Sequence, residues 1–372
     1  MRNDNPFLQL CLLLRQDIGR RDLTGRDLDW AGIIALANRH RVTPALWFNL
    51  RQKELDEIVP AAIRSTMANI YTLNNQRNRV IKSEAVEALD RLATAQITPV
   101  LLKTAVNMFE ASNAELGIWV TRDIDLLVKQ AALTQAASIL MSAGYKASLP
   151  YDPTLHSYPS LSKPGKVVTL DVHRDIGPQR NVLTVEDAMA EAWPLPGHDK
   201  ALILSPTHRL VHLLYHSEIQ DRRYELGKIS LHQLLNFKYL TDRFGDRIDW
   251  KEVQIRLANA GGRRILPAYC YTAERLFGIA HRNWPRATAR ARLHFRRCMV
   301  QKSIPMLERA VETWGVITPQ MSRHRIEYTI GQSRGAVFRF LHRIRITYGF
   351  IQRNGVQIVG KIEKVRQLRA RK

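Results

Sequence analysis

The chain has 372 residues and is 45% hydrophobic, and its 56 Lys and Arg outnumber its 34 Asp and Glu to give a formal charge of +22. This length is too great for one ordinary core and predicts two or three packed units, while the apolar content excludes wholesale disorder. Three scattered cysteines exclude a disulfide framework and a zinc pattern, and the longest early apolar run (CLLL, residues 11–14) is too short to cross a bilayer. We therefore expect a protein of the reducing cytoplasm.

The positive charge is concentrated near the C-terminus. Residues 323–372 contain 13 Lys or Arg against 2 Glu, a net charge of +11, which is half of the total. Such a localised excess predicts a polyanionic partner: RNA, DNA, an anionic membrane or nucleotide phosphates. The alternative is a basic surface that binds no specific partner and only aids solubility.

The first 95 residues are predicted to be helical. Apolar residues recur at helical spacing through residues 30–42, and Pro44 predicts the start of a further helix. Residues 60–95 follow the pattern of one long helix with many Asn and Arg on its solvent-exposed face. We assign residues 1–95 to an N-terminal helical region.

Strand and helix patterns then alternate between residues 96 and 178, which indicates a small α/β unit. In chain order we expect a strand in 97–103 (ITPVLLK), a helix in 104–116, a strand in 123–128 (DIDLLV), a helix in 131–145 and a two-stranded hairpin in 156–175. The second helix is expected to stop at Gly144, which permits a left-handed turn, and Pro164-Gly165 predicts the hairpin turn.

Helical periodicity returns after this unit. Ser205 is the predicted N-cap of a helix whose first residue is Pro206. We assign residues 179–322 to a C-terminal helical domain and residues 323–372 to a basic helical tail. The predicted fold class is therefore α+β, a small mixed β-sheet flanked by α-helical N- and C-terminal regions.

Two aspartates lie one residue apart in the strand DIDLLV. Side chains alternate faces along a strand, so Asp123 and Asp125 point the same way, while Ile124 and Leu126 point into the core. Two carboxylates on one face repel unless a cation bridges them, and Mg²⁺ prefers oxygen ligands. Asp171 on the second hairpin strand is a third acid that would complete a two-metal site.

A phosphate site is predicted at the other end of the unit. The helix that begins near Thr104 offers free N–H groups and the positive end of its dipole, and Lys103 adds a point charge. This ordered combination with three aspartates is typical of phosphoryl or nucleotidyl transfer, in which one metal activates the acceptor hydroxyl and the other holds the phosphates. Solvated edge-strand acids or a helix cap are the structural alternatives for the D-x-D pair.

Four motifs appear in the order PVLLKT (99–104), RDIDLLV (122–128), LMSAGYKA (140–147) and LDVHRDI (170–176). Together with helices on both sides, they resemble the bacterial uncharacterised nucleotidyltransferase family of the DNA polymerase β-like superfamily. The likeness covers roughly residues 28–280. It identifies residues 96–178 as the nucleotidyltransferase core.

The resemblance implies metal-dependent transfer of a nucleoside monophosphate from an NTP to a hydroxyl acceptor, with release of pyrophosphate. Asp123 and Asp125 would be metal ligands, and Asp171 would ligate the catalytic metal and help to deprotonate the acceptor. Two Mg²⁺ ions are the implied cofactors. Lys103 would face the phosphates.

The chain departs from the family pattern at three places. Thr104 replaces a Gly and either crowds the triphosphate or supplies a hydroxyl to it. Trp119 stands where an Arg is usual, and Arg122 directly precedes the first Asp. His232 lies near an expected Asp, and we predict that it shares a helix face with Lys228, as a nucleotide-binding pair or as a plain surface pair.

Several histidines have open roles. His208, His212 and His216 lie four residues apart, a spacing that can ligate zinc or pack the helix against the α/β unit. His173 shares a strand face with Asp171 and could orient it, contact substrate, or be a structural strand-end residue.

The basic tail alternates cations with apolar and aromatic residues such as Phe340, Tyr348 and Phe350. This pattern suits RNA, an anionic membrane surface, or a simple basic cap over the catalytic unit. We expect an NTP and a polyanionic acceptor, with RNA (tRNA included) as the first choice, in the cytoplasm or peripherally at a membrane. The alternative is a non-catalytic RNA- or membrane-surface-binding protein that retains the fold.

Overall fold

The computed structural model describes residues 5–177 and 182–320. Residues 1–299 form one compact unit, and a second unit begins at Val300. Helix α14 (Ala289–Ser303) reaches across this boundary, and α15 (Pro305–Gln320) follows it. The predicted basic tail, residues 323–372, lies outside the described residues.

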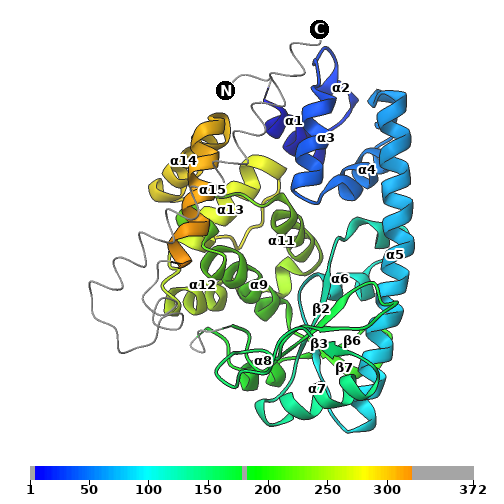
Figure 1. The fold of residues 1–372 in the computed structure, drawn as a ribbon. Coiled ribbons are helices and arrows are strands. Elements are labelled where there is room, and N and C mark those ends of the chain that lie inside the picture. The colour runs from blue at the N-terminus through cyan, green and yellow to red at the C-terminus, as the bar shows by residue number, and fades with distance from the viewer. Residues whose placement is uncertain (1–4, 178–181, 321–372) are drawn as a thin grey trace, which may run out of the picture. The chain divides into compact units, whose positions relative to one another are not determined.

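The N-terminal region is helical, as predicted. Its elements are α1 (Pro6–Leu14), α2 (Arg20–Leu23), α3 (Trp30–Arg39), α4 (Thr43–Gln52), the short 3₁₀ helix η1 (Asp56–Ile58) and α5 (Ala61–Thr94). Helix α5 has 34 residues and runs from the N-terminal helices to the sheet (Figure 1). Its first half contributes Met67 to the helical core and its second half contributes Leu89 to the core under the sheet, so one helix connects both.

A mixed seven-stranded sheet has the order β3-β4-β5-β2-β1-β7-β6. Its strands are β1 (Val100–Leu101), β2 (Asp123–Leu127), β3 (Lys146–Ala147), β4 (Leu161–Ser162), β5 (Thr169–His173), β6 (Trp193–Leu195) and β7 (His198–Ile203). Between them lie α6 (Lys103–Glu110), η2 (Leu116–Ile118), η3 (Gln130–Ala132), α7 (Leu133–Ser142) and α8 (Val185–Ala190). Strand β2 is parallel to β5 and antiparallel to β1, which confirms the α+β class with a mixed sheet.

Two strands of this sheet were not predicted. Strands β6 and β7 form an antiparallel pair, and β7 pairs with β1, so the sheet extends past the predicted core of residues 96–178. The segment WPLPGHDKALI carries two prolines and two charged residues, which weakens the strand pattern. The predicted hairpin is present, with Leu161 opposite Leu170 and Gly165 in the left-handed region at φ +80°.

Alternation along β2 and β5 separates two faces of the sheet. Ile124, Leu126, Leu170 and Val172 are fully buried in one hydrophobic cluster with residues of α5 and α7. The intervening residues, which include the aspartates, face the other side. The predicted separation of the aspartates from the apolar core residues is therefore confirmed.

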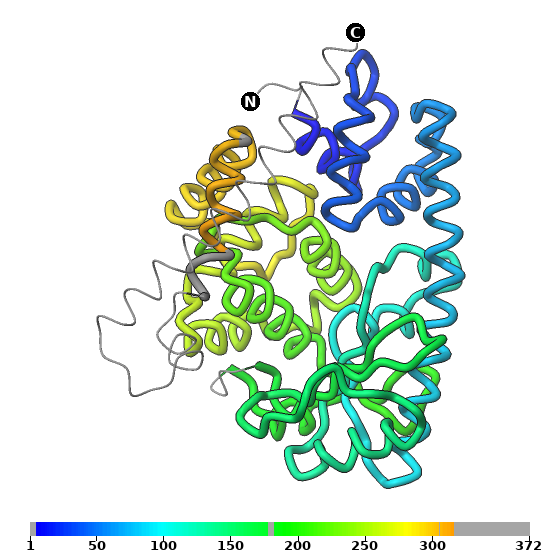
Figure 2. Tube along the Cα trace, in the orientation of Figure 1, coloured from blue at the N-terminus to red at the C-terminus, as the bar shows by residue number. Residues whose placement is uncertain are grey.

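The C-terminal part of the first unit is helical. It comprises α9 (Pro206–Leu214), the π-helix η4 (Tyr215–Gln220), α10 (Arg223–Leu226), α11 (Leu231–Phe244), η5 (Gly245–Arg247), α12 (Trp250–Asn259) and α13 (Ile265–Phe277). The Ser205 hydroxyl accepts a hydrogen bond from the His208 N–H at 3.3 Å, as expected of the predicted cap. Helices α1 and α13 lie side by side although they are far apart in sequence (Figure 2), and both contribute to one large core.

The described residues contain no helix that is long and apolar enough to cross a bilayer. The cysteines Cys11, Cys270 and Cys298 are all buried.

Candidate functional site

The aspartates meet where β2 and β5 run side by side. The parallel register pairs Asp125 with Asp171 and Asp123 with Thr169, so all three carboxylates lie on one face. Potential ligand atoms of Asp125, Asp171 and His173 all lie within 4.8 Å of one another. Asp123 lies one step further along β2, outside this closest group, with its carboxylate 3.3 Å from the Thr121 hydroxyl.

Asp125 is the most buried acid of this group, with 1% of its surface exposed. One of its oxygens, Oδ1, lies 2.5 Å from Lys103 Nζ and 2.9 Å from His173 Nε2. Burial by itself would raise the pKa of Asp125, but the His173 hydrogen bond and the Lys103 charge outweigh it and hold that pKa well below its usual value. Asp125 is therefore a carboxylate at neutral pH, and Lys103 is its counter-charge.

Lys103 is the first residue of α6 and has a left-handed backbone conformation, φ +56°, which residues other than glycine rarely adopt. This conformation turns the chain sharply from β1 into α6 and lets the side chain reach back over the sheet. Burial lowers the pKa of Lys103, but the nearby Asp125, Asp123 and Asp171 together raise it by more. The net shift is upward, and the ammonium stays charged. The residue predicted to face phosphates thus forms an ion pair with Asp125.

Asp171 differs from Asp125 in its surroundings. Its Oδ1 accepts a hydrogen bond from the Ser160 hydroxyl at 2.5 Å. Burial raises the pKa of Asp171 most, the Ser160 hydrogen bond opposes this, and the charges of Asp125 and Asp123 raise it again. Ser160 was not singled out in the sequence, because only the pairing of β4 with β5 brings it to Asp171.

His173 does not contact Asp171 in the way its shared strand face suggested. Its Nε2 atom lies against Asp125 on the neighbouring strand. Its ring also stacks on His156, with 5.8 Å between the ring centroids. His173 therefore hydrogen-bonds and orients Asp125, while its charge also acts on Asp171.

The donor set fits a divalent cation. Three carboxylates share one largely buried face, and Lys103 forms its ion pair with one of them, Asp125. Carboxylate oxygens are the ligands that Mg²⁺ prefers, and one imidazole nitrogen is also compatible with Mn²⁺ or Zn²⁺. Asp125, Asp171 and His173 are the residues closest to forming such a site, and Asp123 flanks it.

A cavity of about 80 Å³ lies next to Lys103, between α6, α9 and α11. Its polar lining comprises Lys103, Thr104, Asn107, Arg209, His212, His216, Gln233 and Asn236. Hydrogen bonds connect the three helices: Asn107 donates to Asn236 at 2.7 Å, and Arg209 donates to Asn107 at 2.9 Å. The N-terminus of α6 therefore faces a polar pocket.

Two of the departures from the family pattern contact each other. The Thr104 hydroxyl lies 3.5 Å from His232 Nε2, and both side chains are buried. Burial, followed by the charges of Arg41 and Arg223, lowers the pKa of His232 to about 4, so the ring is neutral at pH 7. Thr104 and His232 thus form a neutral polar contact between α6 and α11 at the edge of the cavity.

The predicted pairing of Lys228 with His232 on one helix face is wrong. Helix α11 begins at Leu231, so Lys228 precedes it. Lys228 instead lines a separate small pocket with Glu218 and Tyr269. The prediction placed the start of this helix before Lys228, whereas Ser230 caps it.

Two arginines, Arg122 and Arg41, lie near Asp123. Arg122 is exposed directly before Asp123. Burial lowers the pKa of Arg41 most, the charges of Arg122 and Arg223 lower it further, and Asp123 opposes the shift, so these three groups lie near Arg41. Arg41 and Arg223 carry no local motif and were missed. Trp119, which stands where the family carries an Arg, is buried and packs edge-on against Tyr239.

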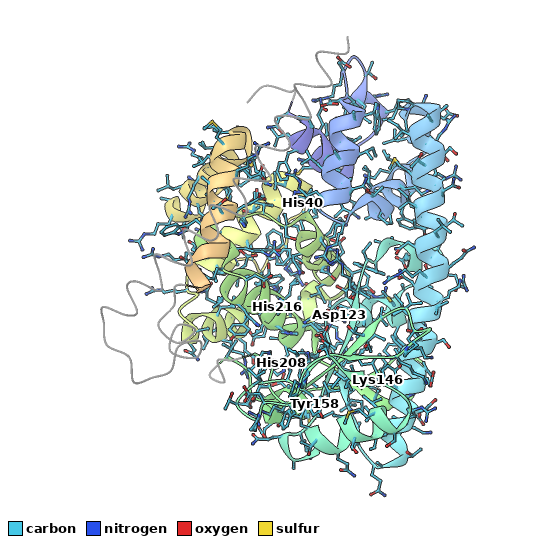
Figure 3. All side chains as sticks on the ribbon, in the orientation of Figure 1. His40, Asp123, Lys146, Tyr158, His208 and His216 are labelled. Atoms are coloured by element: carbon cyan, nitrogen blue, oxygen red, sulfur yellow. The ribbon has the colours of Figure 1, made fainter. Side chains whose placement is uncertain are left out.

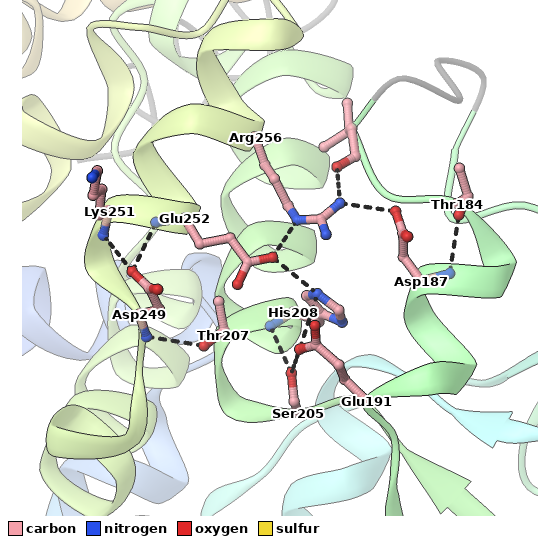
Figure 4. Close-up of polar contacts among 11 residues, drawn as sticks. Thr184, Asp187, Glu191, Ser205, Thr207, His208, Asp249, Lys251, Glu252 and Arg256 are labelled. Carbon is pink, nitrogen blue, oxygen red and sulfur yellow. Dashed lines mark hydrogen bonds and ion pairs between the residues drawn. The ribbon is translucent and has the colours of Figure 1, made fainter.

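The three histidines of α9 and η4 have separate roles. Figure 3 labels His208, His216 and Asp123 where the helical region adjoins the sheet. His212 and His216 line the cavity, and His208 lies between Glu191 and Glu252 (Figure 4). Among residues 5–177 and 182–320, no group of three potential ligands combines two of these histidines, so the predicted spacing does not form a His₃ zinc site there.

Comparison with known proteins supplies the family. A family model described as "Uncharacterised nucleotidyltransferase" matches residues 26–278. Comparisons with curated proteins and with solved structures give no significant match. The matched range spans β2, β5, α6 and the helices around the cavity, in agreement with the resemblance found in the motifs. The chain therefore belongs to the uncharacterised nucleotidyltransferase family.

Proposed function

We propose that this chain is a divalent-metal-dependent enzyme that moves a nucleoside monophosphate from an NTP to a hydroxyl acceptor and releases pyrophosphate. The observation that carries the proposal is the register of β2 with β5. It sets Asp125 beside Asp171 on the face that also holds Asp123, next to the start of α6. Membership of the family supports nucleotidyl transfer in general.

The aspartates would hold the metal. Asp125, Asp171 and His173 offer oxygen and nitrogen donors within 4.8 Å of one another, and Asp123 flanks them on β2. A divalent cation bound there would neutralise charge on the phosphates and polarise the acceptor hydroxyl. His173 holds the Asp125 carboxylate in position, and Ser160 does the same for Asp171.

The residues at the start of α6 would bind the triphosphate. Backbone N–H groups at a helix N-terminus bind anions, and the Thr104 hydroxyl lies in the first turn. Lys103 lies between this turn and Asp125, so its ammonium can pair with either a carboxylate or a phosphate oxygen. Arg41, Arg122 and Arg223 would add positive charge near Asp123 to that of Lys103.

The transfer itself needs a proton acceptor and an aligned hydroxyl. The carboxylate of Asp171 lies on the strand next to the metal-binding aspartates and is placed to take the proton from an incoming hydroxyl. The rest of the catalysis is positioning and charge neutralisation, as is general for phosphoryl transfer.

Metal-dependent release of pyrophosphate tests the proposal. The protein would be incubated with each α-labelled NTP and total cellular RNA, protein or lipid, with MgCl₂ or with EDTA, and both label transfer and pyrophosphate would be measured. We expect label in one fraction only with Mg²⁺, and none with Asp123→Asn. Asp199→Asn, which removes an exposed carboxylate on β7, is the matched control and should behave as wild type.

The opposite outcome is equally clear. If the wild type binds RNA or vesicles equally well with Mg²⁺ and with EDTA, and releases no pyrophosphate with any NTP, the chain is a binding protein that retains the fold.

A further inference from the structure

A second concave site lies on the helical part of the first unit, apart from the aspartates. It is a groove of about 450 Å³ between the end of η4, α10 and the loop that joins α12 to α13. We call it the arginine groove, because Arg222, Arg263 and Arg264 line it. The neighbouring turn needs glycine: Gly261 has φ +79°, and a Cβ on Gly262 would come within 2.8 Å of Ile219.

The groove has cations without partners. Arg263 and Arg264 are exposed, and neither forms an ion pair with a carboxylate in the described part of the chain. The acids in the lining do not neutralise them. Glu225 is held by Arg222, with its oxygens 2.6 and 2.8 Å from the guanidinium, and the fully buried Glu218 accepts from the Ser217 hydroxyl.

Further arginines and an aromatic pair extend the groove toward α14. Tyr224 lines the groove and stacks on His294, with 4.1 Å between the ring centroids and 15° between the planes. The charges of Arg264, Arg297 and Arg290 all act on Tyr224. Residues 282–297 contain six arginines and no acid, and two of them, Arg290 and Arg297, are close enough to act on Tyr224.

The same segment connects the groove to the candidate active site. His216, at the start of η4, lines the cavity beside Lys103, and Arg222, just after η4, lines the groove. Arg223 interacts electrostatically with Arg41, which in turn interacts with Asp123. Residues 216–224 therefore connect the cavity beside Lys103 with the arginine groove along the chain.

We propose that the arginine groove binds the phosphodiester backbone of a single-stranded polynucleotide and so presents the acceptor of the transfer reaction. That the bound polynucleotide is the acceptor rests on the proposed function, whereas binding of a polynucleotide in the groove does not depend on it. Two adjacent exposed arginines in a groove, Arg263 and Arg264, can contact backbone phosphates, and the Tyr224 ring beside them suits a base. A flat membrane would meet only the exposed rim of a concave site.

Binding of a fluorescein-labelled 20-nucleotide single-stranded RNA to the full chain tests the proposal, by anisotropy between about 50 and 300 mM KCl. Each lost phosphate contact lowers the salt slope by about 0.7 for single strands. Arg263→Ala with Arg264→Ala should therefore lower the slope by about 1.4 and weaken binding about 25-fold near 0.1 M salt. A DNA 20-mer should lose affinity in parallel, because the backbone phosphates are shared.

The matched control removes the same charge elsewhere. Arg21 and Arg79 are exposed residues of α2 and α5, and their double alanine variant should change RNA affinity by less than about 2-fold. Equal weakening by both double variants, or no weakening by Arg263→Ala with Arg264→Ala, would overturn the proposal. So would a loss of binding to anionic phosphatidylglycerol vesicles with RNA affinity unchanged.

A second readout separates this proposal from the proposed function. Mg²⁺-dependent NTP binding should be the same in the wild type and in the variant that lacks Arg263 and Arg264, and it should be lost in Asp123→Asn, which keeps its RNA affinity. If neither the wild type nor the variants release pyrophosphate, but the groove variant still loses RNA affinity, the enzyme assignment is wrong and the groove remains a polynucleotide-binding site. If pyrophosphate is released and RNA affinity does not depend on the groove, the groove assignment fails alone.

Discussion

Two groups in the described part of the chain each combine one histidine with two carboxylates, and they differ in what surrounds them. The first is Asp125, Asp171 and His173 on β2 and β5. The second is Glu191, His208 and Glu252, which connects the end of α8 with α9 and α12 (Figure 4). In both groups the potential ligand atoms lie within 4.8 Å of one another. Residue type and proximity alone therefore do not distinguish a candidate active site.

Burial and the local cations make the difference. The Asp125 side chain is 2% exposed, whereas that of Glu191 is 53% exposed, so solvent screens much of the charge in the second group. Glu252 also pairs with Arg256, which contacts Asp187 and the Val182 carbonyl as well. The second group is thus a bridge between helices, while the first adjoins a polar cavity and the start of α6.

The largest expected effect breaks the first group. Asp171→Asn keeps the shape of the side chain but removes a ligand and the proton acceptor, which withdraws about 4 kcal/mol of transition-state stabilisation, or about 1,000-fold in kcat. Pyrophosphate release under saturating NTP and Mg²⁺ measures it. Activity within about 3-fold of wild type would place the reaction elsewhere.

The buried Glu218, unlike Asp125, lacks a cation strong enough to keep its pKa low. Burial raises the pKa of Glu218 to about 7, and Ser217 and Arg223 offset this only in part. Asp221 adds to the rise, and Tyr269 is influenced by the same charge. Between pH 4.5 and 7 the folded state keeps the proton that the unfolded state releases, so stability falls with rising pH by about 3 kcal/mol.

Urea unfolding of the wild type and Glu218→Gln at several pH values isolates this contribution. The stability difference between the two proteins should shift by about 3 kcal/mol across the window from pH 4.5 to pH 7.5, against the glutamate as pH rises. Other groups, such as His232 with its pKa near 4, cancel in the difference. Parallel pH curves for the two proteins would show that Glu218 titrates like an ordinary glutamate.

The bridge of the second group should matter for stability and not for transfer. Glu252→Gln removes the charge that holds the buried His208 and Arg256, and we expect a loss of about 1–3 kcal/mol in the free energy of unfolding. Glu274→Gln on the exposed surface of α13 is the control and should lie within about 0.5 kcal/mol of wild type. A large fall in kcat with unchanged stability would instead assign Glu252 a role in the reaction.

The smallest expected effect concerns the edge of the first group. If the Thr104 hydroxyl contributes to phosphate binding, Thr104→Gly should raise KM for the NTP about 3-fold, and Thr104→Ser should retain wild-type KM. Glycine also loosens the first turn of α6 and should cost about 1 kcal/mol of stability. A lower KM in Thr104→Gly would show that the side chain crowds the triphosphate.

The sequence by itself was enough for features that depend on neighbouring residues. The spacing of Asp123 and Asp125 predicted one shared face, and the 60–95 pattern predicted α5 nearly to the residue. Ser205 and Pro206 predicted the start of α9, because a cap and its helix are separated by only a few positions. Such periods and caps are local, so a single segment contains the whole signal.

Only the tertiary structure decided which of these residues meet. The contacts of Lys103 and His173 with Asp125, of Ser160 with Asp171 and of Thr104 with His232 join residues that are 11 to 128 positions apart. The parallel register of β2 with β5 could not be read from either strand, since a shift of one residue would send Asp171 to the opposite face. The partners of a buried charge are set by packing between segments, and packing is a property of the whole fold.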